Sequence, residues 1–223
     1  MKLMFDCDDT LYDLQWPFKK CVDELLKVDV DFDSFYRDYR MYGDLIFDKL
    51  QEGIITINES GIYRIEKVCE QYHIDISHDL AVDFQNLYRY YQNHIFMDEE
   101  LLNYFSNTSD ELAILTNGQN EHQRNKLSTL RIFEFVDYDH IFTSEELGYA
   151  KPDSRCFLEC MKRMKEKPED WYYVGDNYIN DMEGAKKIGM HTIHFNRHHQ
   201  KSGIAADFEV FSAKEFVDLV KKL

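Results

Sequence analysis

Apolar residues along this 223-residue chain gather in short runs that are separated by longer amphipathic stretches. Short apolar runs bounded by polar or turn residues are typical of buried strands. We predict strands near Lys2–Phe5, Leu112–Leu115, His140–Thr143, Trp171–Val174, His191–Phe195 and, with a weaker pattern, Phe208–Val210.

Helical spacing of apolar residues, three or four apart, fills most of the intervals between the later strands. The pattern predicts helices over Gln119–Leu130, Ser154–Lys165, Ile179–Ile188 and Ala213–Lys222. Alternating strands and helices joined by short loops indicate an α/β fold with a doubly wound parallel sheet. Right-handed crossovers are expected for such connections.

The interval between the first two strands is exceptional, with roughly 100 residues against about 30 for a simple strand–helix–strand unit. It carries apolar stripes of helical period, such as Phe18, Cys21, Val22, Leu25 and Leu26, or Leu80, Phe84, Leu87, Tyr88 and Tyr91. Such stripes are buried only if helices pack against one another. We therefore predict a helical bundle over residues 14–93, inserted into an α/β domain of residues 1–13 and 94–223.

Composition narrows the class of protein. Apolar residues make up 44% of the chain and aromatic residues 15%, which is enough for a sizeable core. The net charge of −16 argues against nucleic-acid polymers and anionic membranes as partners, although a metal ion and a lysine can still bind a small anion. Five irregularly spaced cysteines indicate reduced thiols. Without a signal peptide or membrane span, we expect a cytoplasmic protein of undetermined oligomeric state.

Candidate chemistry begins where the first strand ends, at Asp6-Cys7-Asp8. In an open α/β sheet, ligands bind at the carboxyl ends of the strands. Carboxylates held close together repel one another unless a cation or a proton intervenes. Hard oxygen ligands of this kind suit Mg²⁺. A solvated acidic turn is the simpler alternative for this segment taken alone.

Other predicted strands also end in polar groups. Thr116-Asn117-Gly118 offers a hydroxyl, an amide and a tight turn into a helix, whose free N–H groups can bind an anion. Lys151-Pro152 holds a lysine in an extended conformation before the next helix. Gly175-Asp176 places an acid after the fourth strand, with Asp181 about one helical turn further on. Each signal alone fits an ordinary cap or loop, but parallel topology brings them to one edge of the sheet.

These residues, in this order, resemble the motifs of the haloacid dehalogenase-like (HAD) hydrolase superfamily. The first motif matches Asp6-x-Asp8-x-Thr10, the second Thr116, the third Lys151, and the fourth Gly175-Asp176 with Asp181. The insert falls where that family places its helical cap domain. Stretches such as Thr116-Asn117-Gly118 also resemble, less specifically, the nucleotidase branch of the superfamily.

The resemblance implies a Rossmann-like core with a helical cap and the activity of a phosphoric monoester hydrolase. Asp6 would be the nucleophile that forms an aspartyl-phosphate intermediate. Asp8 would protonate the leaving oxygen and then activate water. The implied substrate is a small phosphorylated metabolite, with nucleoside monophosphates as one class.

The resemblance also implies the binding residues. Mg²⁺ would be held by Asp6, by Asp8 through its backbone carbonyl, and by Asp176, with Asp181 in a supporting position. The phosphate would be bound by Thr116, Asn117 and Lys151.

Alternatives remain open from the sequence. They are a sugar-phosphate phosphatase or phosphomutase of the same superfamily, a non-catalytic module that binds phosphorylated metabolites, and a receiver-type signalling domain. A degenerate binding module is expected to have lost Asp6 or Asp8, and both are present. The large insert and the order of Lys151 before Asp176 argue against a receiver. A dehalogenase needs no acid at Asp8, because a halide leaves without protonation.

Two clusters are interpreted as structural. The histidines near the last strands, His191, His194, His198 and His199, are expected to form a solvated surface. Tyr88, Tyr90 and Tyr91 of the insert are expected to serve packing, rather than stacking on a base.

Overall fold

The computed structural model describes residues 1–223, apart from the side chains of Phe47 and Gln51. The chain forms two compact units, one of Met1–Leu14 with Ile95–Leu223 and one of Gln15–His94. The predicted insert, residues 14–93, differs from the second unit by one residue at each end.

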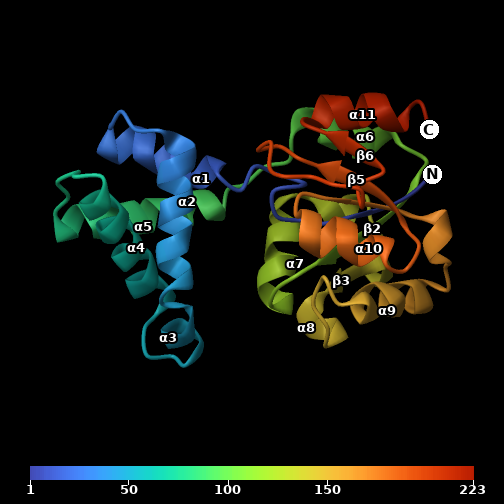
Figure 1. The fold of residues 1–223 in the computed structure, drawn as a ribbon, viewed down its shortest axis with the longest axis horizontal. Coiled ribbons are helices and arrows are strands. Elements are labelled where there is room, and N and C mark those ends of the chain that lie inside the picture. Colours follow the sequence, from blue (N-terminus) through green and yellow to red (C-terminus); the bar gives the residue numbers. More distant parts are fainter. The chain divides into compact units, whose positions relative to one another are not determined.

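The first unit is built on a six-stranded parallel sheet in the order β3-β2-β1-β4-β5-β6 (Figure 1). Its strands are β1 (Lys2–Phe5), β2 (Glu111–Thr116), β3 (Ile141–Thr143), β4 (Tyr172–Gly175), β5 (His191–Phe195) and β6 (Phe208–Val210). Because β1 lies between β2 and β4, the chain proceeds outward in both directions from the centre. The predicted doubly wound α/β fold is therefore confirmed.

Alternation along the strands gives the sheet two buried faces. Leu3 and Phe5 of β1 join one apolar core cluster, while Met4 between them joins the other. Successive side chains of a strand point to opposite faces, so a strand buried on both faces is apolar throughout. The same continuous run that predicted β1 therefore also explains why helices cover the sheet on both sides.

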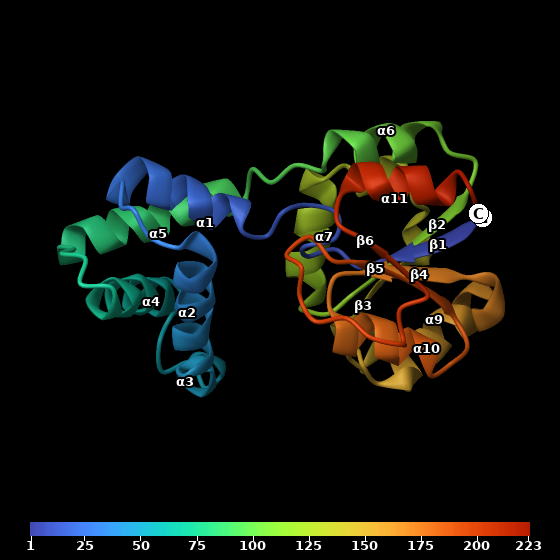
Figure 2. The same cartoon turned by 45° about the horizontal axis from the view of Figure 1, so that its top comes forward.

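Helices α6 (Glu99–Asn107), α7 (Asn120–Thr129) and α11 (Ala213–Val220) cover one face, and α9 (Ser154–Met164) and α10 (Gly184–Lys186) cover the other. Figure 2 shows α6 with α11 on one side of the strands and α9 with α10 on the other. The short elements are α8 (Ser144–Leu147), η2 (Ile132–Glu134), η3 (Tyr138–His140), η4 (Pro168–Asp170) and the π-helical η5 (Tyr178–Glu183). Among the described residues, no helix combines the length and hydropathy needed to cross a bilayer.

One helix prediction needs correction, and one helix was missed. The segment predicted as one helix, Ile179–Ile188, is instead the π-helical η5 followed by the short α10. Wider π turns are often found at functional sites, and this one carries Asp181. Helix α6 was not predicted; it has only nine residues, and its buried residues Leu101 and Phe105 form a single pair four residues apart.

The second unit is a helical bundle with its own core. Its elements are α1 (Trp16–Cys21), η1 (Val22–Leu26), α2 (Phe32–Asp44), α3 (Phe47–Gln51), α4 (Ile57–Gln71) and α5 (His78–Gln92). The ring of Phe18 lies at the centre, 4.4 Å from the ring of Tyr39 and 5.4 Å from that of Phe84. Tyr88 is buried in the same core, as predicted for a packing residue. This aromatic core explains how the insert is stabilised as a separate unit.

Candidate active site

The predicted site residues lie at the carboxyl end of the parallel sheet. Asp6 directly follows β1, Thr116 is the last residue of β2, and Asp176 directly follows β4. These three strands are neighbours in the sheet, so their ends are adjacent. Lys151 reaches the same place from the loop that precedes α9.

Lys151 is a buried cation with three oxygen partners. Its Nζ lies 2.6 Å from Asp181 Oδ1, 2.9 Å from Asp6 Oδ1 and 2.8 Å from the hydroxyl of Tyr173. Only 2% of its side chain is exposed. Burial disfavours the charged amine, but the carboxylates of Asp181 and Asp6 outweigh it and raise the pKa of Lys151. The lysine is therefore charged and fixed beside the predicted nucleophile.

Asp6, Asp176 and Asp181 form a group in which each offers a carboxylate oxygen within 4.8 Å of the others. Burial raises the pKa of Asp6 to about 6. The positive charge of Lys151 lowers this pKa, and the negative charges of Asp181 and Asp8 raise it. Burial and the charges of Asp181 and Asp6 also raise the pKa of Asp176 well above its usual range. One lysine does not balance three carboxylates. This donor set of hard oxygens fits a divalent cation such as Mg²⁺.

Asp181 is fully buried and serves two partners. One of its oxygens accepts from Lys151, and the other accepts from the backbone N–H of Asn177 at 3.0 Å. Gly175 makes this position accessible, because a Cβ on it would lie 2.3 Å from Asp181 Oδ2. The glycine of the fourth motif is therefore required by the close approach of the acid that holds Lys151.

Asn117 and Thr116 are engaged differently. The Asn117 side chain accepts from the backbone N–H of Lys151 at 2.9 Å and donates to its carbonyl at 3.0 Å. Asn117 thus fixes the Lys151 backbone. The buried Thr116 hydroxyl lies 3.1 Å from the donor Nε2 of Gln123, so its own proton is still available to a phosphate oxygen.

The carboxylate of Asp8 lies apart from the three-carboxylate group and faces α7. Lys126 Nζ lies 2.7 Å from Oδ1 and 3.0 Å from Oδ2, and Gln123 Nε2 donates to Oδ2 at 3.0 Å. The hydroxyl of Tyr12 also donates to Asp8. Burial opposes the charge, but Lys126 and these hydrogen bonds lower the pKa of Asp8.

Sequence reasoning missed several residues of this site. Gln123 and Lys126 are three apart in the helix that follows Thr116-Asn117-Gly118, a spacing that puts them on one face and could have revealed them. Tyr173 donates to the carbonyl oxygen of Leu115 and accepts from Lys151. It was missed because it is part of an apolar strand, where a tyrosine is expected to serve packing.

The prediction of a solvated surface was wrong for His194. Its side chain is fully buried, and Nε2 lies 2.8 Å from the carbonyl oxygen of Asp176 while Nδ1 lies 2.9 Å from the Ser202 hydroxyl. The cause is sheet register, since His194 pairs with Gly175 on the neighbouring strand β4. His194 thus holds the backbone of the residue that carries the Asp176 carboxylate.

A second group of possible ligands comprises Asp9, Asp13 and His198. His198 Nε2 lies 2.9 Å from Asp9 Oδ2. Burial lowers the affinity of this imidazole for a proton, but the bond to Asp9 outweighs it and raises the pKa of His198. The direct contact between His198 and Asp9 accounts for their proximity.

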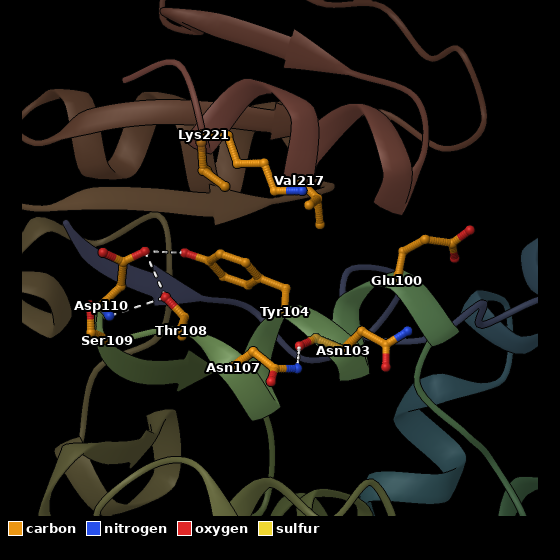
Figure 3. Close-up of a pocket in the computed structure, with 10 residues that line it drawn as sticks. Glu100, Asn103, Tyr104, Asn107, Thr108, Ser109, Asp110, Val217 and Lys221 are labelled. Carbon is orange, nitrogen blue, oxygen red and sulfur yellow. Dashed lines mark hydrogen bonds between the residues drawn. The ribbon is translucent and has the colours of Figure 1, made fainter.

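A hollow of about 620 Å³ lies at the amino end of β2, at the opposite end of the sheet from the predicted site residues. Figure 3 shows it between α6, which contributes Asn103 and Tyr104, and α11, which contributes Val217 and is followed by Lys221. It contains none of the predicted site residues. Its size alone therefore does not identify it as the functional site.

Comparison with known sequences gives one family and several relatives. A profile described as haloacid dehalogenase-like hydrolase matches residues 3–195. A protein named glyceraldehyde 3-phosphate phosphatase from Methanopyrus kandleri is 33% identical over 119 residues, 51% of this chain and 50% of that protein. A protein of the same name from Pyrococcus furiosus is 24% identical over 224 residues, 98% of this chain and 87% of its own length. The chain spans about half the length of the first relative.

Solved structures show the same fold. A putative HAD-hydrolase from Bacillus subtilis, bound to magnesium, has a TM-score of 0.68 at 21% identity, covering 98% of this chain and 97% of that one. A HAD phosphatase from Thermococcus onnurineus has a TM-score of 0.59 at 20% identity, covering 99% and 98%. At these identities the likeness concerns the fold.

Proposed function

The chain belongs to the haloacid dehalogenase-like hydrolase family, and on this premise we propose that it is a Mg²⁺-dependent phosphatase acting on a small phosphomonoester. The supporting observation is the place of Asp6, which follows β1 beside a buried lysine and two further carboxylates. The relatives named as phosphatases support the same reaction class. A carboxylate nucleophile divides hydrolysis into two easier transfers.

In the first proposed step, a carboxylate oxygen of Asp6 attacks the phosphorus atom and the bond to the leaving oxygen breaks. Asp8 donates its proton to that leaving oxygen. In the second step, Asp8 takes a proton from water, and the water oxygen attacks the phosphorus of the aspartyl-phosphate. Inorganic phosphate leaves and the Asp6 carboxylate is restored. Lys151 and the Thr116 hydroxyl bind phosphoryl oxygens throughout, the lysine as a point charge.

The three-carboxylate group supports Mg²⁺ as the cofactor. Asp6 and Asp176 would hold the ion, together with the backbone carbonyl of Asp8. Asp181 would act in support, because both its oxygens already accept hydrogen bonds. When bound, the ion would reduce repulsion between the Asp6 carboxylate and the phosphate and stabilise the charge of the transferred group.

For the substrate, we propose a small sugar or triose phosphate as the first class to test. The name shared by several relatives, glyceraldehyde 3-phosphate phosphatase, favours this class over the nucleoside monophosphates suggested by the sequence. We assign the helical unit the role of the family's cap domain. The five free, buried cysteines support a cytoplasmic location.

The test is phosphate release from a panel of glyceraldehyde 3-phosphate, sugar phosphates and nucleoside monophosphates, with Mg²⁺ or with a chelator. Asp6→Asn should lose at least about 1,000-fold in kcat, because no second nucleophile replaces the carboxylate. Asp218→Asn, which changes an exposed carboxylate of α11, serves as the matched control and should keep full activity.

Outcomes of this panel separate the alternatives. Turnover retained by folded Asp6→Asn would remove Asp6 from the role of nucleophile. An isomerised sugar phosphate without free phosphate would indicate a mutase. Binding without turnover in the native protein would indicate a sensor of phosphorylated metabolites.

A further inference from the structure

Helix α7 holds the side chain of Asp8 through two residues on one of its faces. Lys126 Nζ contacts both carboxylate oxygens, at 2.7 and 3.0 Å, and Gln123 Nε2 contacts Oδ2 at 3.0 Å. Residues three apart on a helix lie side by side, so the two donors reach the same carboxylate. About a quarter of the Asp8 side chain, 27%, is still exposed. The carboxylate is thus held from one side and accessible from the other.

Gln123 connects Asp8 to the other residues proposed for the reaction. Its Nε2 lies 3.1 Å from Thr116 Oγ1 and 2.6 Å from the carbonyl oxygen of Asn117, as well as 3.0 Å from Asp8. The side chain is buried, with 2% exposed. One amide nitrogen therefore sets the spacing between the proposed acid, the phosphate-binding hydroxyl and the turn that fixes Lys151.

The turn before α7 is shaped to allow this. Gly118 has a φ of +142°, and a Cβ at this position would lie 3.0 Å from the Gln123 side chain. A larger residue would be strained at this φ and would require the Gln123 side chain to shift by a few tenths of an ångström. Gly118, two residues after the end of β2, thus leaves room for the side chain that contacts Asp8.

We infer that Lys126 and Gln123 are positioning residues that hold the Asp8 carboxylate in the orientation used for the second step, attack of water on the aspartyl-phosphate. This inference rests on the proposed function. Lys126 contacts both carboxylate oxygens and Gln123 contacts one of them, so together they fix the orientation in which Asp8 faces the attacking water.

The inference predicts an unequal effect on the two steps. In p-nitrophenyl phosphate the leaving group needs no protonation, so kcat/KM reports attack by Asp6, and kcat reports the second step if that step is slow. Lys126→Met should lower kcat about 10- to 100-fold, because a base displaced by an ångström loses that much, and should change kcat/KM by less than about 3-fold. Rapid mixing should then show a burst of p-nitrophenolate of about one equivalent per active site.

Comparison variants make the result specific. Lys126→Arg keeps the charge and should recover most of kcat. Lys162→Met, on an exposed lysine of α9, should behave like the native enzyme. Gln123→Leu should reproduce the burst. If Lys126→Met does not fold by circular dichroism, Lys126→Gln keeps the stem of the side chain and takes its place.

Equal losses in kcat and kcat/KM without a burst would show a merely structural role and overturn the inference. Unchanged kinetics in Lys126→Met would overturn it as well. Neither result touches the proposed function as long as Asp6→Asn is inactive. Conversely, an active Asp6→Asn would refute the covalent mechanism whatever Lys126 does.

Discussion

At each end of the parallel sheet an aspartate contacts a cation. The two ends differ in the ratio of carboxylates to the donors around them. At the carboxyl end, Asp6 and Asp181 contact one buried lysine, Lys151, and the carboxylate of Asp176 lies beside these two acids. At the amino end, Asp110 alone accepts from the N-terminal ammonium, the Tyr104 hydroxyl and the Thr108 hydroxyl.

The pKa values follow this difference. At the carboxyl end, burial and neighbouring acids raise the pKa of Asp6 and of Asp176. At the amino end, burial would raise the pKa of Asp110, but the bonds from the N-terminus, Tyr104 and Thr108 outweigh it and lower it. The hollow of about 620 Å³ lies at the amino end, where hydrogen bonds and an ion pair compensate the charge of Asp110. Perturbed pKa values, rather than the size of a hollow, therefore favour the carboxyl end of this sheet as the end at which we propose the reaction.

The largest contrast should come from removing the buried cation. Lys151→Met leaves Asp6 and Asp181 buried without a positive charge and should lower the free energy of unfolding by about 3–5 kcal/mol, besides abolishing turnover. Lys2→Met, at the amino end of β1, removes only partly exposed ion pairs with Glu166 and Glu111 and should cost about 0–1 kcal/mol. Urea denaturation measures both, and equal costs would contradict the comparison.

A smaller effect is expected from adding a methyl group at Gly175, at the carboxyl end of the sheet. In Gly175→Ala the new Cβ would meet Asp181 at 2.3 Å, displacing the acid that orients Lys151. We expect kcat/KM to fall about 10- to 100-fold because of this displacement. Added to Asp181→Asn, the same change should have little further effect on kcat/KM. Full additivity of the two losses would show that Gly175 acts by another route.

Binding of Mg²⁺ at the carboxyl end should stabilise the protein. At Mg²⁺ concentrations about 100 times the Kd, binding to the folded state alone contributes about 2.7 kcal/mol and raises the melting temperature. Asp176→Asn should abolish this shift, whereas Asp110→Asn should preserve it. A shift that survives Asp176→Asn would place the ion elsewhere.

The smallest effect is expected from a mutation at the amino end of the sheet. Asp110→Asn should cost about 1–2 kcal/mol at neutral pH through weakened hydrogen bonds, with kcat/KM unchanged. The folded-state pKa of Asp110 is lowered, so its contribution is present above the usual value of 3.8 and is lost as the pH falls through the lowered pKa. Urea denaturation of both proteins across this acidic range should show the difference shrinking, and a constant difference would contradict the assignment.

The sequence by itself determined the sheet, both its faces and the polar residues at its strand ends. Local features suffice for this: continuous apolar runs form strands buried on both faces, and parallel topology collects their carboxyl ends. Asp6, Thr116, Lys151 and Asp176 were therefore identifiable before any coordinates.

Tertiary structure alone decided how these groups are held and charged. The contacts of Tyr173 with Lys151, of His194 with the Asp176 carbonyl and of Lys126 with Asp8 join residues from different elements. Such contacts depend on sheet register, on helix rotation and on the π turn of η5. The local spacing of apolar residues does not predict any of these three. The balance of charge at a site is a sum over neighbours in space, so only the packed fold could show which end of the sheet is left uncompensated.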